Sequence, residues 1–246
     1  MASSADGAFA LKLALPGSQI ERLVREADAL ASCSHGSVAT LIEAVTFKWI
    51  IQDIWVVREE YLSGGTLEAK LENGSLEVDD VRHLGQCLAD VLTHLHPKRL
   101  VHRDIKPANI MFRDDGRTPV LTDFGVVRML DAKTLTADFA ARGPCTPHYA
   151  APEQLNNETK LIDWRTDQFC LAIVMCECLG GQHPFYEIGM LPHEIVGTVA
   201  ARGSLPAATQ QTLHARGFGA LVRALEPWPV KRFRLPAEFR AALNIN

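Results

Sequence analysis

The sequence lacks the features that mark several broad classes of protein. Its six cysteines contain no CxxC pair, and only Cys176 and Cys178 lie close together, which fits neither a zinc pattern nor a disulfide framework. The nine histidines show no HExxH spacing, which argues against a metal site built from histidine. Basic residues are not in excess, since 25 Lys and Arg stand against 29 Asp and Glu. Nucleic acid is therefore not an expected partner.

Long apolar runs and targeting segments are also missing. The longest apolar run, 169–179, is interrupted by Glu177 and is too short to span a bilayer. The N-terminal apolar stretch contains Lys12 and has no basic residue ahead of it, unlike a secretory signal peptide. No internal repeat or low-complexity tract is visible. We therefore expect a cytoplasmic protein with no membrane segment in this chain.

What is present is the composition of an ordinary globular protein. The chain has 246 residues, of which 47% are hydrophobic and 22% charged, enough to bury a sizeable core in one large domain or two lobes. Hydrophobic patterning predicts a strand-rich start and a mainly helical remainder. The expected strands are 9–14, 41–47 and 54–59, the last two joined by a hairpin connection over 48–53, and the expected helices are 19–31, 78–95 and a buried one over 169–179.

The most informative chemistry lies between residues 101 and 125. A short stretch between apolar, strand-like pieces carries the carboxylates of Asp104 and Asp123, the ammonium of Lys106 and the amide of Asn109. Carboxylate and amide oxygens are hard ligands that suit Mg²⁺. A lysine suits a phosphate as a point charge. The segment therefore favours a site for a magnesium-bound phosphate compound.

These residues resemble two motifs of protein kinases. The run His102-Arg103-Asp104-Ile105-Lys106-Pro107-Ala108-Asn109 resembles the catalytic loop, and Asp123-Phe124-Gly125 resembles the metal-binding motif. Further matches follow in the expected order, at Ala151-Pro152-Glu153, His183-Pro184-Phe185 and 226–233. The chain thus resembles the eukaryotic-type (Hanks-type) serine/threonine protein kinases, a family with bacterial members.

The resemblance implies a two-lobed α+β fold. A partial small lobe would cover 1–60, with the third strand, the helix that carries Glu26, and the fourth and fifth strands. A helical large lobe would cover 61–246, with ATP bound between the two. In that lobe the resemblance implies that Asp167 ties down the catalytic loop and that Arg232 forms an ion pair with Glu153.

The resemblance also assigns roles to single residues. Asp104 would accept the proton of a serine or threonine hydroxyl on a protein substrate, and Lys106 would steady the γ-phosphate. Asn109 and Asp123 would hold Mg²⁺. Lys12, positioned by Glu26, would bind the α- and β-phosphates. The carbonyl of Glu60 and the amide of Leu62 would hold the edge of adenine.

The sequence departs from the family pattern at two places. No GxGxxG precedes Lys12, and 3–7 is expected to form only a turn into the third strand of the family pattern, which carries Lys12. The loop that covers the phosphates is therefore missing. Either the chain is a kinase that is truncated or wrongly started at its N-terminus, or it works without the loop. We expect the chain as given to bind Mg-ATP weakly. Glu59 falls where the family usually has an apolar or hydroxyl residue, so its carboxylate should either have a partner or be perturbed by desolvation.

Three interpretations remain open on the sequence. Lys106 and the Thr146-Pro147 pair favour a serine/threonine kinase over a tyrosine kinase. In that case we expect autophosphorylation at Thr136, or else at Thr134, with the phosphate contacting Arg103. The missing loop favours a pseudokinase that acts as a binding or scaffold module. A small-molecule phosphotransferase would share Asp104, but Lys106 and the Ala-Pro-Glu motif speak against it. The oligomeric state is left open.

Overall fold

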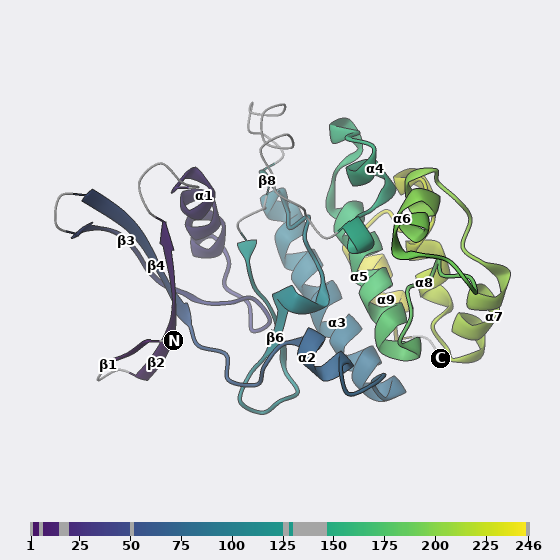
Figure 1. Ribbon diagram of the computed structural model, residues 1–246, viewed down its shortest axis with the longest axis horizontal. Helices are drawn as coiled ribbons and strands as arrows, with labels where there is room; N and C mark the ends of the chain where they lie inside the picture. Colours follow the sequence, from purple (N-terminus) through teal and green to yellow (C-terminus); the bar gives the residue numbers. More distant parts are fainter. Residues whose placement is uncertain are drawn as a thin grey trace.

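The N-terminal part of the chain forms a four-stranded antiparallel sheet in the order β1-β2-β4-β3, as the computed structural model shows (Figure 1). The structure describes residues 2–4, 7–14, 20–49, 52–124, 128–129 and 147–244. The strands are β1 (Ala2–Ser4), β2 (Gly7–Ala14), β3 (Leu41–Trp49) and β4 (Gln52–Glu60), and helix α1 (Ile20–Ala31) packs against the sheet.

The register of the two inner strands decides which side chains face the helix. In the β2–β4 pair Ala10 lies opposite Glu59 and Lys12 lies opposite Val57. Because side chains alternate along a strand, these four residues share one face of the sheet. Val57 on that face is completely buried, in a small apolar cluster with side chains of α1. The polar residues beside it are therefore directed toward the interior of the molecule.

Two local expectations are wrong. Ser3 and Ser4 belong to β1, which pairs with β2, and do not form a turn. The hairpin connection over 48–53 is too long, because Lys48 pairs with Asp53 inside the strands. In both places the backbone pairing extends through polar or small residues that give no apolar alternation. Strand ladders are held by backbone hydrogen bonds, so they can continue beyond the side-chain pattern.

The large lobe is mainly helical. Its helices are α2 (Leu67–Leu71), α3 (Val78–Leu95), α4 (Pro152–Leu155), α5 (Trp164–Gly180), α6 (Pro192–Ala200), α7 (Ala207–Ala215), α8 (Gly219–Ala224) and α9 (Pro236–Ala242). Short strands complete it, namely β5 (Leu100–Val101), β6 (Ile110–Phe112), β7 (Pro119–Leu121) and β8 (Arg128–Met129). With the small sheet beside it, this is the two-lobed α+β fold expected from the sequence.

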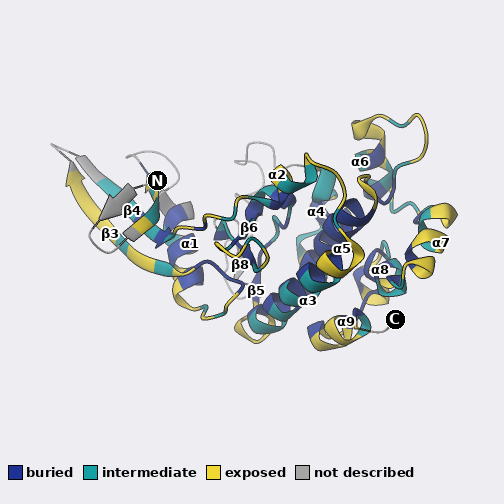
Figure 2. Cartoon of the chain, turned by 90° about the horizontal axis from the view of Figure 1, so that it is seen from below, coloured by how far each residue is buried: buried dark blue, intermediate teal, exposed yellow. Residues whose placement is uncertain are grey.

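Helix α5 forms the centre of the large lobe, as the apolar stretch 169–179 predicts. Almost all of its side chains are buried (Figure 2). Asp163 caps its start by accepting a hydrogen bond from the backbone N–H of Arg165 (2.8 Å), and Gly181 ends it with a φ of 68°. A left-handed residue that ends a helix is usually glycine, since a Cβ is disfavoured there. The helix is therefore fixed at both ends.

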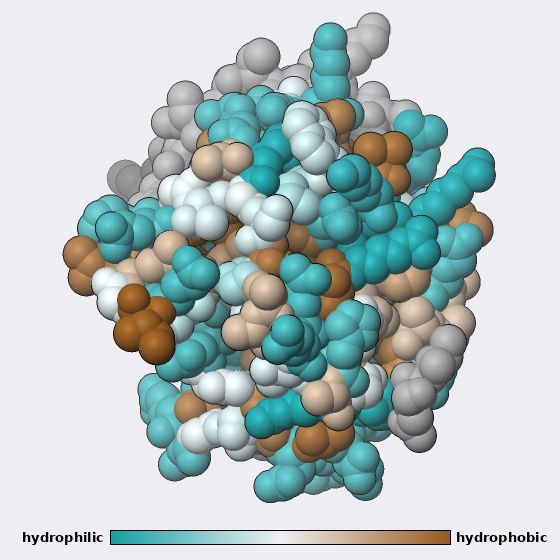
Figure 3. All heavy atoms as spheres, turned by 90° about the vertical axis from the view of Figure 1, so that its right-hand side faces the viewer, coloured by the Kyte–Doolittle hydropathy of each residue, from teal (hydrophilic) through white to brown (hydrophobic). Residues whose placement is uncertain are grey.

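The outer surface of the large lobe contrasts with this core. On the face that carries α6 to α9, hydrophilic side chains predominate and the hydrophobic ones stand apart from one another (Figure 3). In the part of the chain that the structure describes, no helix combines the length and the apolar content that a membrane crossing requires.

The two lobes are joined by backbone pairing as well as by the chain. The N–H of Ala39 donates to the carbonyl of Leu121 (3.1 Å), and the N–H of Leu121 donates to the carbonyl of Ser37 (2.9 Å). Leu121 belongs to β7, which pairs with β6. The segment after α1 is thus attached to the hairpin that follows residues 102–109, and a pocket lies beside this junction.

Candidate active site

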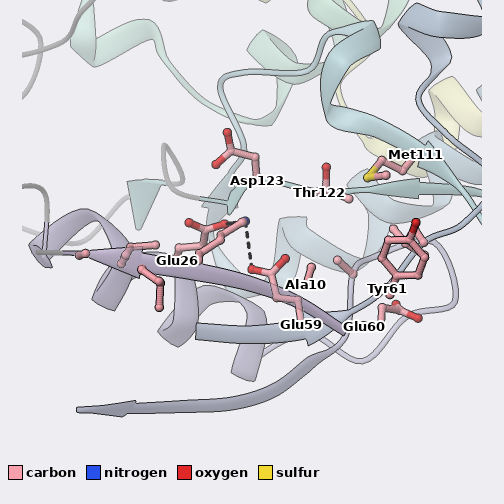
Figure 4. Close-up of a pocket in the computed structure, with 14 residues that line it drawn as sticks. Ala10, Glu26, Glu59, Glu60, Tyr61, Met111, Thr122 and Asp123 are labelled. Carbon is pink, nitrogen blue, oxygen red and sulfur yellow. Dashed lines mark hydrogen bonds and ion pairs between the residues drawn. The ribbon is translucent and has the colours of Figure 1, made fainter. Parts of the chain in front are cut away.

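A pocket of about 640 Å³ lies between the small sheet and the large lobe. Figure 4 shows Glu26 and Glu59 projecting into it from the small lobe, with Thr122 and Asp123 on the facing side. Tyr61 and the residues on either side of it close the end where β4 leaves the sheet. The pocket therefore brings together residues from both lobes that are far apart in the sequence.

Lys12 is held by two carboxylates on the small-lobe side. Its ammonium pairs with Glu26 of α1 and lies 3.0 Å from Oε1 of Glu59 on β4. Burial lowers the pKa of Lys12, but the negative charges of Glu59 and then Glu26 outweigh this effect and leave the pKa above its ordinary value. For the acid Glu26 burial has the opposite sign: it raises the pKa, and this outweighs the lowering effect of the Lys12 charge. Lys12 therefore stays charged.

The unusual carboxylate of Glu59 thus has a partner. Its side chain is 4% exposed, and the dashed line in Figure 4 that reaches it marks the ion pair with Lys12. This confirms the first of the two outcomes expected from the sequence. An unpaired carboxylate at this depth would lower the free energy of unfolding by about several kcal/mol, the usual penalty for a buried ion.

The connection between the lobes begins at Glu60. The Glu60 carboxylate accepts from Arg113 (2.7 Å) and from the backbone N–H of Thr40 (2.8 Å), on elements outside the pocket. Burial tends to raise the pKa of Glu60, but the hydrogen bonds from Arg113 and Thr40 lower it below its usual value. Leu62, two residues later, is buried and lines the pocket. The structure thus places both predicted adenine-binding positions at the pocket's edge.

The predicted catalytic residues form one hydrogen-bonded cluster. Asp104 Oδ2 lies 2.9 Å from the ammonium of Lys106. The side-chain amide nitrogen of Asn109 donates to the same Asp104 oxygen (3.0 Å) and to the Asp104 carbonyl (2.9 Å). Since the nitrogen of Asn109 is engaged in this way, its Oδ1 is the atom left to bind a cation.

Asp123 lines the same pocket as Lys12. Its φ is 58°, in the left-handed region that residues other than glycine seldom adopt. Arg103, next to Asp104, has a φ of 69°. Strained backbone of this kind is often found at functional sites, where the surroundings hold it in place. Here the surroundings are well defined, because the segment around Asp104 is tied to α5.

Asp167 of α5 provides that tie. It is 1% exposed and accepts hydrogen bonds from the backbone N–H groups of His102 and Arg103, both at 2.7 Å. Gln154 adds a further bond, from its side-chain nitrogen to the carbonyl of Arg103 (2.8 Å). The role expected for Asp167 is confirmed. No motif or residue spacing in the sequence identifies Gln154 as part of this site.

His102 is packed inside this assembly. Its ring is buried, lies edge-on to Phe124 with a centroid distance of 4.8 Å, and Nε2 donates to the carbonyl of Thr122 (3.0 Å). The backbone N–H of Asp104 donates to Nδ1 (3.3 Å). Burial lowers the pKa of His102, so the ring is neutral with both nitrogens engaged. It supports the loop and is not placed to act as a base.

Some predicted positions lie outside the described residues. These are residues 5 and 6 of the expected turn, Gly125, Thr134, Thr136 and Thr146. Residue Arg113 was missed by the sequence analysis, although it pairs with Glu60. The two are separated by 53 residues, and no local pattern connects them.

The donor atoms fit a magnesium-bound nucleotide. Mg²⁺ takes oxygen ligands, often only one or two from the protein, and completes its shell with water and phosphate oxygens. Asn109 Oδ1 and the Asp123 carboxylate could supply such ligands. Within the described residues, no three His, Cys, Asp or Glu side chains gather into a metal site.

Comparison with known proteins gives the family. A family model described as "Protein kinase domain" matches residues 6–211. A probable serine/threonine-protein kinase of Clostridium perfringens is 29% identical over 221 residues, 89% of this chain and 31% of the relative. The serine/threonine-protein kinase PrkC of Bacillus subtilis is 32% identical over 167 residues (68% and 24%), and PknF of Mycobacterium tuberculosis is 36% identical over 172 residues (67% and 34%).

The chain belongs to the protein kinase domain family. The resemblance to bacterial Hanks-type serine/threonine kinases is confirmed. The domain therefore belongs to the class of protein serine/threonine kinases. The chain spans about a third or less of the length of these relatives, between 24% and 34%.

Proposed function

We propose that this chain acts as an ATP-dependent serine/threonine protein kinase, which transfers the γ-phosphate of Mg-ATP to a hydroxyl of a protein substrate. The observation that carries the proposal is the cluster in which Asp104, Lys106 and Asn109 are bonded to one another. Family membership supports it. So does the position of Lys12 and Asp123 in the neighbouring pocket.

The reaction needs little covalent chemistry from the protein. The oxygen of the substrate hydroxyl forms a bond to the γ-phosphorus while the bond from that phosphorus to the oxygen of the leaving ADP breaks. Asp104 is the acceptor for the hydroxyl proton. Lys106, 2.9 Å from Asp104, offsets negative charge on the transferring group. Mg²⁺ bound by Asn109 and Asp123 would neutralise charge on the β- and γ-phosphates.

The small lobe would hold the rest of the nucleotide. Lys12, which is paired with Glu26, would contact the α- and β-phosphates. The carbonyl of Glu60 and the amide of Leu62 would take the edge of adenine. We place the boundary between the lobes near residue 60, where β4 ends.

The second candidate function is a pseudokinase that binds partners without turnover. The observation that favours it is the absence of GxGxxG from the sequence, since the backbone amides of that loop help to hold the phosphates. A pseudokinase would keep the fold and the pocket. The two candidates therefore differ in phosphoryl transfer and not in structure.

The test replaces single carboxylates without changing their size. We expect Asp104→Asn and Asp123→Asn each to reduce transfer of radiolabelled phosphate to a generic serine/threonine substrate by about a thousandfold or more, because transition-state stabilisation is lost. Asp114→Asn is the matched control, since Asp114 is exposed on the turn between β6 and β7. It should keep full activity, and melting curves should show that all three variants remain folded.

Two outcomes would contradict the proposal. Undiminished transfer by Asp104→Asn would remove Asp104 from the reaction. A parent protein that binds Mg-ATP but transfers no phosphate to any protein would favour the pseudokinase.

A further inference from the structure

Glu59 occupies a position that the chemistry proposed above does not use. It lies on the central strand β4, opposite Ala10, while Lys12 lies two residues further along β2 on the same face of the sheet. Such diagonal neighbours are within reach when the side chains are long. The result is a buried ion pair, with Glu59 4% exposed and its Oε1 3.0 Å from the lysine ammonium.

The geometry around Lys12 leaves room for a ligand as well. A lysine ammonium carries three N–H donors. Two carboxylates pair with this ammonium, that of Glu26 from the helix and that of Glu59 from the sheet. The side chain of Lys12 is 31% exposed, and Lys12 lines the pocket. At least one donor thus remains for a phosphate oxygen.

The two carboxylates are attached to the fold in different ways. Glu59 is on a strand that is paired on both sides, with Ala10 of β2 and with Leu41 of β3. Glu26 is on α1, whose contact with the sheet includes a small cluster of Ala14, Leu23, Ala27 and Val57. A shift of α1 would displace Glu26 from Lys12. It would leave Glu59 in place, because Glu59 and Lys12 belong to the same sheet.

We propose that Glu59 is a second positioning residue for Lys12, which keeps the ammonium directed at the phosphates without help from Glu26. The inference rests on the proposed function, in which Lys12 contacts the nucleotide. It follows that either carboxylate alone supports activity. Only the loss of both releases Lys12.

The charges agree with this assignment. Of the two carboxylates, Glu59 makes the larger electrostatic contribution to raising the pKa of Lys12. Removing Glu59 therefore weakens the hold on the ammonium even while Glu26 remains. A carboxylate that only filled space would have no such effect.

A double-mutant cycle tests the proposal. Glu26→Gln and Glu59→Gln keep the size of each side chain and remove its charge. We expect each single variant to lower kcat/KM for ATP by less than about tenfold, and the double variant to lower it by more than about a hundredfold, beyond the product of the singles. Glu59→Asp keeps the charge with a shorter reach and should lie between the parent and Glu59→Gln. Glu43→Gln, on the exposed side of the same sheet, is the matched control.

A second measurement does not depend on catalysis. Acetylation of Lys12 by a small water-soluble amine reagent is followed by peptide mass spectrometry in the protein without nucleotide. We expect faster labelling in Glu59→Gln and in Glu26→Gln than in the parent, and the fastest labelling in the double variant. Glu43→Gln should label at the parent rate. Melting curves confirm that each variant is folded.

The outcomes separate this inference from the proposed function. Parent-like labelling of Lys12 in Glu59→Gln overturns it, as does a double variant no worse than the product of the singles. Tighter ATP binding by Glu59→Gln also overturns it, since Glu59 would then be a competitor of the phosphate. A parent without transferase activity overturns the proposed function, whereas the labelling pattern still decides whether Glu59 positions Lys12.

Discussion

Arg232 and Glu153 form an ion pair that is closed to solvent, with both side chains 0% exposed. Two guanidinium nitrogens donate to the two carboxylate oxygens, at 2.7 and 3.0 Å. Thr166 donates to Glu153 as well (2.8 Å), and the guanidinium lies over the ring of Phe169. The pair expected from the sequence is confirmed, and it connects the segment after α8 to α4 and α5.

Removal of Arg232 should therefore be severely destabilising. In Arg232→Met the carboxylate of Glu153 is left buried without a counter-charge, which costs about 3–5 kcal/mol of unfolding free energy. Urea denaturation measures the change. Arg240→Met is the control, because Arg240 is 50% exposed in its pair with Asp90 and should cost less than about 1 kcal/mol. A loss below 1 kcal/mol in Arg232→Met, about that of the control, would contradict this account.

The sequence predicts the pair of Arg232 with Glu153 only through a family motif, because neither hydrophobic periodicity nor residue spacing connects the two residues. Motifs and amphipathic helices are local, so 78–95 and the residues around Asp104 can be identified without a structure. The pair of Lys12 with Glu59 depends on strand register, which side-chain alternation alone does not determine. The extension of the strands through Lys48 and Asp53 depends on backbone pairing. Both follow only from the folded sheet.

His183 should make stability depend on pH. Its Nε2 donates to the carbonyl of His148 (3.0 Å), and the backbone N–H of Phe185 donates to its Nδ1 (3.3 Å), so the neutral ring is required. Burial and the neighbouring His148 lower the pKa of His183 to about 3. The unfolded histidine has a pKa of about 6.5. Below that pH the unfolded state binds a proton that the folded state excludes.

Stability contributed by His183 is therefore lost as the pH falls from about 6.5 toward 3. At about pH 5 the loss from this one group is about 2 kcal/mol. His183→Gln should be less stable than the parent near neutral pH but should lose less stability on acidification. Urea denaturation at several pH values measures the slopes, with the exposed His193→Gln as control. Equal slopes for the parent and His183→Gln would rule out this role.

Gly64 should not tolerate a side chain. A Cβ there would lie 2.1 Å from the carbonyl oxygen of Arg113, which belongs to the backbone and cannot rotate away. Gly64 also donates to the carbonyl of Phe112 (3.0 Å), so the connection between the lobes would have to separate from β6. We expect Gly64→Ala to cost about 1–3 kcal/mol of unfolding free energy.

The matched control for Gly64 is Gly36. No heavy atom lies within 4 Å of a Cβ built at Gly36. Gly36→Ala should change the unfolding free energy by no more than about 0.5 kcal/mol. Thermal denaturation compares the two variants, and similar melting temperatures would show that the connection can shift without cost.

Nucleotide binding should require a divalent cation. Glu26, Glu59 and Asp123 place more negative than positive charge around Lys12, so a polyphosphate without a cation is repelled. ATP with Mg²⁺ should raise the melting temperature, whereas ATP with a chelator or Mg²⁺ alone should change it little. Asp123→Asn should remove most of the effect of Mg²⁺, because a ligand is lost. Thermal shift with each component added separately measures this, with Asp114→Asn as the control. An equal shift for ATP in the presence of chelator would show that Asp123 holds no cation for the nucleotide.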